Sequence, residues 1–302
     1  MNRKSVSCVL TSFNKKLDVQ CNLRALRYQT YAPAEVIVVD NHSADGTADM
    51  IKAEFPEVRL IEMPHSSFGA CETFNLGFKA ASSEFIAIMD DDVVAPPDWL
   101  ERVMQRFAQE PASTAMISSK AVEPGMPQAF IAAESHERYM ATFRGCGTVV
   151  RREVLMRAGM YDEKFFIYGN ERDLAARVLN LGYRILQYPR ATLFHGTPFG
   201  MKAGKRSLYY HVRNFWLYAF KNCAWWDVLH VGCALGLRGL GLVKSKPSTD
   251  AVGTIGLNET IKRTPGGKQI ALRATIDAIK LLPHCLRHRQ VCRAPDFTPP
   301  LR

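Results

Sequence analysis

The sequence lacks a closely spaced pair of cysteines. Zinc sites and redox motifs place two cysteines within a few residues of each other, so neither kind of site is predicted here. Disulfides are typical of oxidising compartments, and we therefore expect free thiols in a cytoplasmic protein. The eight cysteines are scattered over 302 residues: Cys8, Cys21, Cys71, Cys146, Cys223, Cys233, Cys285 and Cys292.

The sequence also lacks a long uninterrupted apolar run. The first apolar stretch covers only residues 6–10, which predicts a strand and not a signal peptide. Residues 223–243 are long enough to suggest a membrane span, but Asp227, His230 and Arg238 interrupt them. We expect a buried helix or a helix at an interface there, with plain packing, an oligomer contact and a membrane surface as open alternatives.

Neither an internal repeat nor a nucleic-acid recognition motif is evident. The formal net charge of +10 nevertheless favours an anionic partner. Without a recognition motif we predict no nucleic-acid partner, and a phosphorylated small molecule or an anionic membrane surface would satisfy the same charge.

What the sequence does contain is an alternation of strand-like and helix-like segments. A hydrophobic content of 47% is enough for a large core. The alternation is typical of an α/β fold with a doubly wound, mostly parallel sheet. Expected strands are residues 5–11, 35–40, 58–62, 84–89, 183–188 and 191–194; expected helices are 18–29, 44–55, 69–81, 98–110, 152–158 and 171–181. Residues 114–131 show a weaker pattern, in which Pro124, Gly125 and Pro127 mark a loop that we expect to face an acceptor.

Three consecutive aspartates follow the apolar run of residues 85–89. Open α/β sheets bind ligands beyond the carboxyl ends of their strands, and carboxylates there suit a hard divalent cation. Asp40 ends another expected strand, and His195 ends the last one. Each of these residues, taken alone, could also belong to an ordinary turn. Only the combination of motifs distinguishes a binding site from such turns.

Taken in order, the motifs resemble those of inverting family 2 glycosyltransferases with the GT-A fold. The resemblance covers roughly residues 5–222 and extends to the rhamnosyltransferase-like members through residues 209–214. It rests on residues 11–14 (Thr-Ser-Phe-Asn), 38–47, 75–77 (Asn-Leu-Gly), 90–92 and 171–174 (Glu-Arg-Asp-Leu).

The resemblance implies a role for each matching residue. Asp92 and His195 would bind Mg²⁺ or Mn²⁺, and Glu171 would be the general base, with Asp173 as the competing candidate. Glu171 is favoured although the residue before it is Asn170, where such enzymes commonly carry Glu-Asp. The donor-binding residues would be Thr11, Ser12, Asn14, Asp40, Asn75, Asp90, Asp91 and Arg213.

The composition changes after Pro198, where we place a boundary between a catalytic domain, residues 1–198, and a helical, basic C-terminal region, residues 199–302. Residues 245–267 are expected to be loop-like, and residues 268–289 to form one helix. The C-terminal region would complete the site and contact a membrane or a partner subunit.

The prediction is therefore a metal-dependent transferase that moves a sugar from a nucleoside-diphosphate donor to a hydroxyl of a glycan or lipid-linked acceptor, in cell-surface polysaccharide or glycolipid assembly. We further predict that the sugar is rhamnose-like and that the protein is cytoplasmic, at or near the inner face of the membrane. Self-association is also expected. Two alternatives stay open: a non-catalytic sugar-nucleotide or polysaccharide-binding protein, and a sugar-phosphate nucleotidyltransferase. The latter would carry a glycine-rich phosphate loop with Arg and Lys where this chain has residues 11–14.

Overall fold

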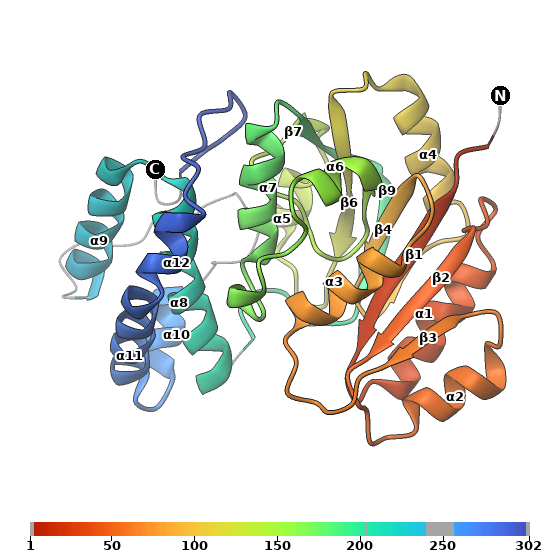
Figure 1. Cartoon of the computed structure of the whole chain (residues 1–302), viewed down its shortest axis with the longest axis horizontal. Helices are drawn as coiled ribbons and strands as arrows, with labels where there is room; N and C mark the ends of the chain where they lie inside the picture. Colours follow the sequence, from red (N-terminus) through yellow and green to blue (C-terminus); the bar gives the residue numbers. More distant parts are fainter. Residues whose placement is uncertain (1–2, 203, 240–256, 300–302) are drawn as a thin grey trace.

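The protein has a mixed α/β core with a group of helices at one end (Figure 1). The structure is a computed structural model and describes residues 3–202, 204–239 and 257–299. One nine-stranded sheet runs through the core in the order β3-β2-β1-β4-β8-β6-β9-β5, with β7 beside β9. The expected α/β fold class is confirmed. The strands are β1 (Val6–Ser12), β2 (Glu35–Asp40), β3 (Arg59–Glu62), β4 (Phe85–Met89), β5 (Val93–Val94), β6 (Thr114–Val122), β7 (Arg138–Tyr139), β8 (Thr148–Arg151) and β9 (Arg184–His195).

Strands β3, β2, β1 and β4 form the parallel half of the sheet. All five residues of β4 are buried, as expected of a parallel strand covered on both faces. In the register of β1 and β2, Ser12 pairs with Asp40. The polar residues that follow β1, β2 and β4 therefore meet at one edge of the sheet, which positions the site.

The weak pattern after residue 114 hides a central strand, β6, which was not predicted from the sequence, and the loop marked by Pro124, Gly125 and Pro127 follows that strand. Strand β6 pairs with β8 and β9 and is almost entirely buried. Two consecutive serines obscure its apolar character, but their hydroxyls are satisfied inside the protein. Ser118 Oγ lies 3.1 Å from Thr148 Oγ1, and Ser119 Oγ accepts a hydrogen bond from the indole of Trp99.

The last two expected strands are a single strand, β9. Its pairing with β6 shifts register between Tyr188 and Thr192, and Pro189 lies in the shifted segment. Proline has no N–H to donate to a ladder, which explains why the sequence reads as two strands. The second part of β9 carries His195 to its end.

Helices cover both faces of the sheet. Apolar residues of α1, α2 and α4 pack on one face, and those of α3, α6 and α7 pack on the other. The helices of this part are α1 (Lys16–Arg27), α2 (Thr47–Glu54), α3 (Ala70–Ala80), α4 (Trp99–Gln109), α5 (Gln128–Ala133), α6 (Arg152–Arg157), the short 3-10 helix η1 (Glu163–Phe165) and α7 (Asn170–Asn180).

The C-terminal helices form the group at the left of Figure 1, next to α7. Leu217, Tyr218 and Cys285 belong to the same apolar cluster as α7, so the group shares the core of the sheet. The boundary near Pro198 stays a prediction. The helices are α8 (Lys205–Asn222), α9 (Trp225–Gly239), α10 (Leu257–Arg263), α11 (Gly267–Lys280) and α12 (Leu282–Arg287).

Two expectations for this region change. The segment expected to be loop-like contains α10, while its residues 245–256 lie outside the described residues, as does the end of the 223–243 segment. The single expected helix is divided into α11 and α12, because Pro283 starts a new helix after Leu281. Within the described ranges, none of the helices combines the length and apolarity that a membrane crossing requires. All eight cysteines are free, as predicted.

Candidate active site

The aspartates after β4 lie at the carboxyl edge of the sheet and are held in place by β1 and α1. The side chain of Asn22 donates to the backbone oxygen of Asp90 (2.8 Å). Lys15 Nζ lies 3.7 Å from Asp92 Oδ2 and brings a positive charge from the α1 side. Packing inside the sheet fixes β4, so the backbone that carries these carboxylates is fixed as well.

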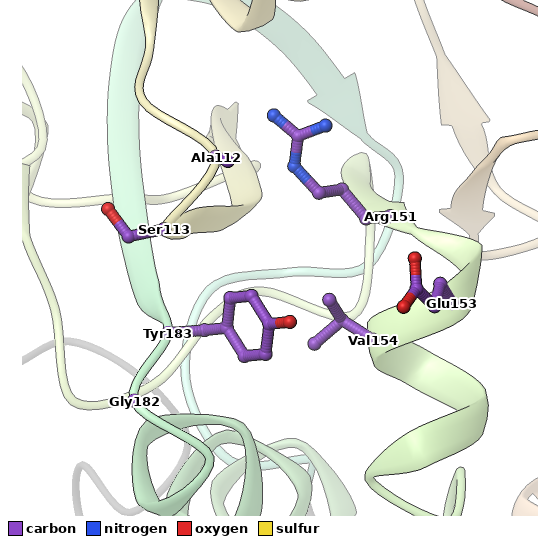
Figure 2. Close-up of a pocket in the computed structure, with 7 residues that line it drawn as sticks. All are labelled: Ala112, Ser113, Arg151, Glu153, Val154, Gly182 and Tyr183. Carbon is purple, nitrogen blue, oxygen red and sulfur yellow. The ribbon is translucent and has the colours of Figure 1, made fainter.

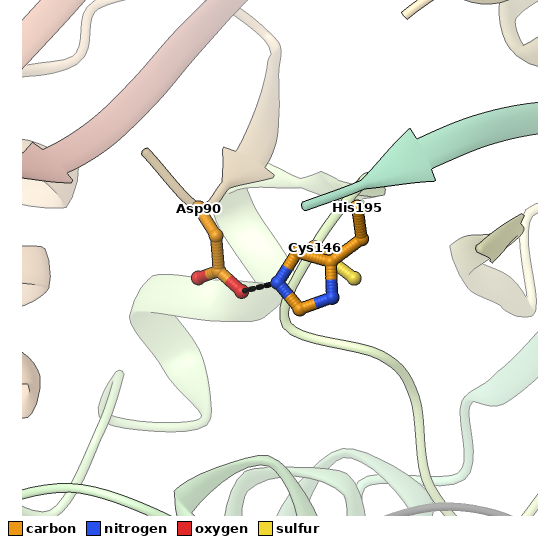
Figure 3. A group of neighbouring side chains, drawn as sticks. All are labelled: Asp90, Cys146 and His195. Atoms are coloured by element: carbon orange, nitrogen blue, oxygen red, sulfur yellow. Dashed lines mark ion pairs between the residues drawn. The ribbon is translucent and has the colours of Figure 1, made fainter. Parts of the chain in front are cut away.

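His195 reaches these aspartates because β5 and β9 are antiparallel and pair Val93 with His195. Its Nε2 lies 3.1 Å from Asp92 Oδ1 and 3.5 Å from Asp90 Oδ2. Figure 3 shows the imidazole directed at the Asp90 carboxylate, with Cys146 behind the ring. Residues more than 100 positions apart in the chain thus converge on one nitrogen.

Glu123 is a member of this group that sequence reasoning missed. Its Oε1 lies 3.0 Å from Nδ1 of His195 and accepts a hydrogen bond from Arg144 (3.1 Å). Glu123 therefore orients the imidazole so that Nε2 faces the aspartates. It follows β6, and without that strand in the prediction no signal placed it at the edge. We call Asp90, Asp91, Asp92, Glu123 and His195 the edge cluster.

The edge cluster has more carboxylates than cations, and this excess of negative charge shifts the pKa values of its members. Burial and the neighbouring carboxylates Asp90 and Asp92 raise the pKa of Asp91 to about 7. Burial disfavours the charged form of His195. Hydrogen bonds to Asp92 and Glu123 outweigh this effect of burial and raise the pKa of His195 to about 10. Burial likewise opposes ionisation of Asp92, yet hydrogen bonds from His195 and Thr197 lower its pKa to about 2.

The donor set fits a divalent cation. Atoms of Asp90, Cys146 and His195 lie within 4.8 Å of one another, and Asp92 joins them through the same imidazole nitrogen. Burial holds the pKa of the Cys146 thiol well above its usual value, so the sulfur stays protonated and is a poor ligand. Two carboxylates and one imidazole remain. A cation at this position would replace the proton on Nε2 of His195, and the resulting donor set suits Mn²⁺ or Mg²⁺.

Glu171 lies in the first turn of α7, after the left-handed residue Gly169. Its carboxylate packs against Gly145, where an added Cβ would come within 2.8 Å of Oε1. Gly145 directly precedes Cys146, so this contact places Glu171 beside the edge cluster. Burial raises the pKa of Glu171 to about 7, with the charge of Asp90 adding to the effect. A carboxyl group with that pKa is suited to take a proton near neutral pH.

Asp173 faces the opposite way, as its spacing from Glu171 on a helix requires. It is fully buried, with Arg177 Nη2 2.8 Å and Lys221 Nζ 2.8 Å from its carboxylate. Lys221 also lies 2.6 Å from Asp162 Oδ2, which in turn is 2.9 Å from Nε2 of His284. We call these five residues the ion-pair cluster.

The loops after β1 and β2 are joined at the same edge. Ser12 Oγ donates to Asp40 Oδ1 (2.6 Å), and the other Asp40 oxygen accepts the backbone N–H of Ser43. Asn14, with a positive φ of 52°, accepts the N–H of Ala44. Thr11 precedes these residues in β1. The structure thus brings these four predicted donor-binding residues together.

Asn75 and Arg213 are instead attached to residues 160–168, the loop that leads into α7. Asn75 Nδ2 donates to the backbone oxygen of Tyr161 and its Oδ1 accepts the N–H of the same residue. The Arg213 guanidinium donates to the backbone oxygens of Lys164 and Phe165. These hydrogen bonds position the loop before Glu171.

A pocket of about 320 Å³ opens at the other end of the strands. Figure 2 shows Arg151, Glu153 and Tyr183 around it. Arg151 pairs with Phe85, the first residue of β4, so this pocket lies at the edge opposite to Asp90–Asp92. It is not the donor site.

Comparisons with known proteins point to one family. Residues 7–161, about half of the chain, match the model of the family described as Glycosyl transferase family 2. The chain is 31% identical over 114 residues to the putative glycosyltransferase EpsH of Bacillus subtilis, covering 36% of this chain and 32% of EpsH. It is 32% identical over 102 residues to the succinoglycan biosynthesis protein ExoO of Rhizobium meliloti, covering 33% and 29%.

The matched segments span about a third to a half of the length of the first curated relatives. Among solved structures, the mannosyltransferase PcManGT from Pyrobaculum calidifontis, in complex with GDP-Man and Mn²⁺, superposes with a TM-score of 0.59. The superposition covers 96% of this chain and 77% of that one at 18% identity. At that identity the likeness shows the fold alone.

Proposed function

The chain belongs to glycosyl transferase family 2, and we propose that it transfers a sugar from a nucleoside-diphosphate donor to an acceptor hydroxyl with inversion. The observation that carries this proposal is the position of Glu171, a carboxyl group with a pKa of about 7, beside carboxylates and an imidazole that suit a divalent cation. An inverting displacement needs one base for the acceptor proton and one electrophile for the leaving diphosphate. Glu171 would be the base, and the edge cluster would hold the cation that serves as the electrophile.

Asp90, Asp92 and His195 would hold the divalent cation, and Glu123 would fix the imidazole from behind. A bound divalent cation neutralises the charge that develops on the departing nucleoside diphosphate. Lys15, 3.7 Å from Asp92, adds a positive charge on the α1 side. PcManGT binds Mn²⁺ with its nucleotide sugar, which supports a divalent cation here as well.

The joined loops after β1 and β2 would bind the nucleotide. Asp40 is buried and its oxygens are bound by Ser12 and Ser43, so it shapes the loop that receives the base. Thr11 and Asn14 would present polar groups to the base, and Asp91 would face the ribose. Asn75 and Arg213 would act by holding the loop before Glu171 in position.

Glu171 would take the proton from the acceptor hydroxyl as that oxygen attacks the anomeric carbon. Asp173 is the weaker candidate, because both its oxygens are engaged by cations or by Asn222 inside the protein. A second carboxylate positioned for a double displacement is not required, since one base suffices for inversion.

The acceptor proposed is a glycan or a lipid-linked saccharide, as in polysaccharide assembly, the process named for ExoO. A rhamnose-like donor sugar rests on residues 209–214 alone, and a cytoplasmic location is likewise a proposal. A panel of nucleotide sugars, assayed for release of the nucleoside diphosphate, would identify the donor.

The decisive experiment is thermal unfolding with UDP, dTDP and GDP, each with and without Mn²⁺ or Mg²⁺, for the wild type and Asp92→Asn. A ligand that binds only the folded protein raises Tm. We expect a metal-dependent rise with one nucleotide in the wild type, and its loss in the variant. Transfer should fall by about 10²–10³-fold, the usual cost of removing one group that stabilises developing charge.

Asp98→Asn is the matched control, because the exposed Asp98 pairs with Arg102 and lies outside the edge cluster. If no nucleotide raises Tm with either metal, the donor site is wrongly assigned. A metal-dependent shift without any turnover on the donor panel would favour the sugar-nucleotide-binding protein instead.

A further inference from the structure

Helix α11 turns three large apolar side chains to the outside of the molecule. Leu272, Ile276 and Ile279 are 63%, 45% and 54% exposed. They are four and three residues apart and therefore share one helical face. The opposite face contains Ala274 and Ala278, which are fully buried against the protein. The apolar residues point directly away from the core.

Basic side chains border this apolar stripe. Lys268, Arg273 and Lys280 are all exposed, and α11 has a single acidic residue, Asp277. Asp277 lies toward α8, where its Oδ2 accepts a hydrogen bond from Tyr209 (2.9 Å). It also lies within 3.8 Å of Arg273 and 2.9 Å of Lys280, whose side chains remain 81% and 70% exposed. The outward face of α11 is thus apolar in the middle and basic at its margins.

The basic margins of the α11 face indicate which kind of partner can cover it. A second copy of the chain, related by a twofold axis, would bring the same basic margins face to face, and like charges across an interface repel. An anionic lipid surface would neutralise them and accept the apolar stripe. A helix of this kind lies in the plane of the interface and does not cross the membrane.

We propose that α11 docks on the surface of a membrane that contains anionic phospholipid, with Leu272, Ile276 and Ile279 inserted among the lipids. Lys268, Arg273 and Lys280 contact the head groups. Helix α9, which like α11 packs on α8, exposes Trp226 (80%) and Leu229 (57%), and α12 exposes Leu286 (47%), so the same helical group offers further apolar side chains. This docking does not depend on the transfer reaction proposed above.

The test is co-sedimentation of the full-length protein with vesicles of phosphatidylcholine alone and of phosphatidylcholine with phosphatidylglycerol. We expect binding to the anionic vesicles that weakens as salt is raised. Each basic side chain near such a surface contributes about fivefold to the affinity, so Lys268→Gln, Arg273→Gln and Lys280→Gln together should weaken binding about a hundredfold.

A second variant tests the apolar stripe. Leu272→Gln, Ile276→Gln and Ile279→Gln together should weaken vesicle binding at least tenfold, whereas Leu17→Gln with Tyr28→Gln should leave it unchanged. Leu17 and Tyr28 are 72% and 73% exposed on the far side of the sheet, which makes them a matched control. All these side chains are exposed, and an unchanged Tm would show that each variant is folded.

Failure of the wild type to sediment with anionic vesicles would overturn the proposal, as would equal binding by the apolar variant. If the protein instead dimerises in light scattering and the apolar variant is monomeric, a second copy covers α11 and the membrane is excluded. Because vesicle binding is measured without nucleotide, its outcome and that of the nucleotide experiment are separate.

Discussion

The edge cluster and the ion-pair cluster contain the same types of side chain in opposite proportions. In the edge cluster Asp90, Asp92 and Glu123 share one imidazole and Asp91 is a fourth carboxylate, with Lys15 and Arg144 at the margin. In the ion-pair cluster two carboxylates, Asp162 and Asp173, share Arg177, Lys221 and His284. One group is left short of positive charge, and the other is neutralised within the protein.

The pKa values follow this difference. Burial opposes ionisation of both Asp162 and Asp173, yet Lys221 and the other cations lower the pKa of each. At the edge, hydrogen bonds from His195 and Thr197 overcome burial and lower the pKa of Asp92 to about 2, whereas burial and like charge raise the pKa of Asp91 to about 7. A cluster whose negative charge exceeds its positive charge in the folded protein indicates that a ligand brings the missing positive charge. The balanced group is evidence of structure only.

The largest effect that separates the two regions is expected from Glu171→Gln. Loss of a general base costs about 10²–10⁴-fold in kcat. The free energy of unfolding should stay the same or rise, because burial already favours the uncharged form of Glu171. Initial rates of nucleoside-diphosphate release and urea unfolding, measured on the same preparations, give both quantities.

The matched control is Asp173→Asn, two residues along the same helix. It should lower the free energy of unfolding and leave the rate per folded molecule within about tenfold. The wild-type rate should rise with pH through about 7, where Glu171 loses its proton, and Glu171→Gln should lack that rise. A variant that keeps the wild-type pH profile would show that Glu171 is not the base.

The second largest effect is expected from Lys221→Met, which removes the cation shared by Asp162 and Asp173. Breaking a buried ion pair by deleting one partner costs about 3–5 kcal/mol, because the other charge stays buried. Urea unfolding at pH 7 measures the loss. Nucleotide should still raise the Tm of the variant.

Adding Asp173→Asn to Lys221→Met should restore part of that stability, since one uncompensated charge is then gone. Both single variants and the double variant complete a cycle. A loss below about 1 kcal/mol for Lys221→Met would place the pair in the range of exposed ion pairs and contradict a buried network.

The smallest effect expected is a difference in acid stability. The pKa of Asp162 and Asp173 is lower in the folded protein than the unfolded value of about 3.9. Their contribution is therefore present above pH 4 and is lost as pH falls through the folded pKa. Lys221→Met removes a cause of both shifts, so its free energy of unfolding should fall less between pH 5 and pH 2.5. Parallel curves for wild type and variant would contradict this assignment.

The parallel half of the sheet could be predicted from the sequence, because its signals are local. Strands such as β4 are apolar runs bounded by polar residues, and their carboxyl ends meet in any parallel sheet. The aspartates after β4 therefore stood out without knowledge of neighbours. The strand β6 escaped prediction because Ser118 and Ser119 look like loop residues until Thr148 and Trp99 supply their hydrogen-bond partners.

The sequence by itself determined the fold class, the family resemblance and the acidic edge, since periodicity and motif order are properties of the chain alone. Only the tertiary structure decided which carboxylates lack enough positive charge nearby to neutralise them. Glu171 and Asp173 are two residues apart and equally acidic in sequence, but one packs against Gly145 and the other against Lys221. Glu123 met His195 only through the pairing of β6 with β9. Coulomb energies depend on distance and burial, and neither is written in the order of residues.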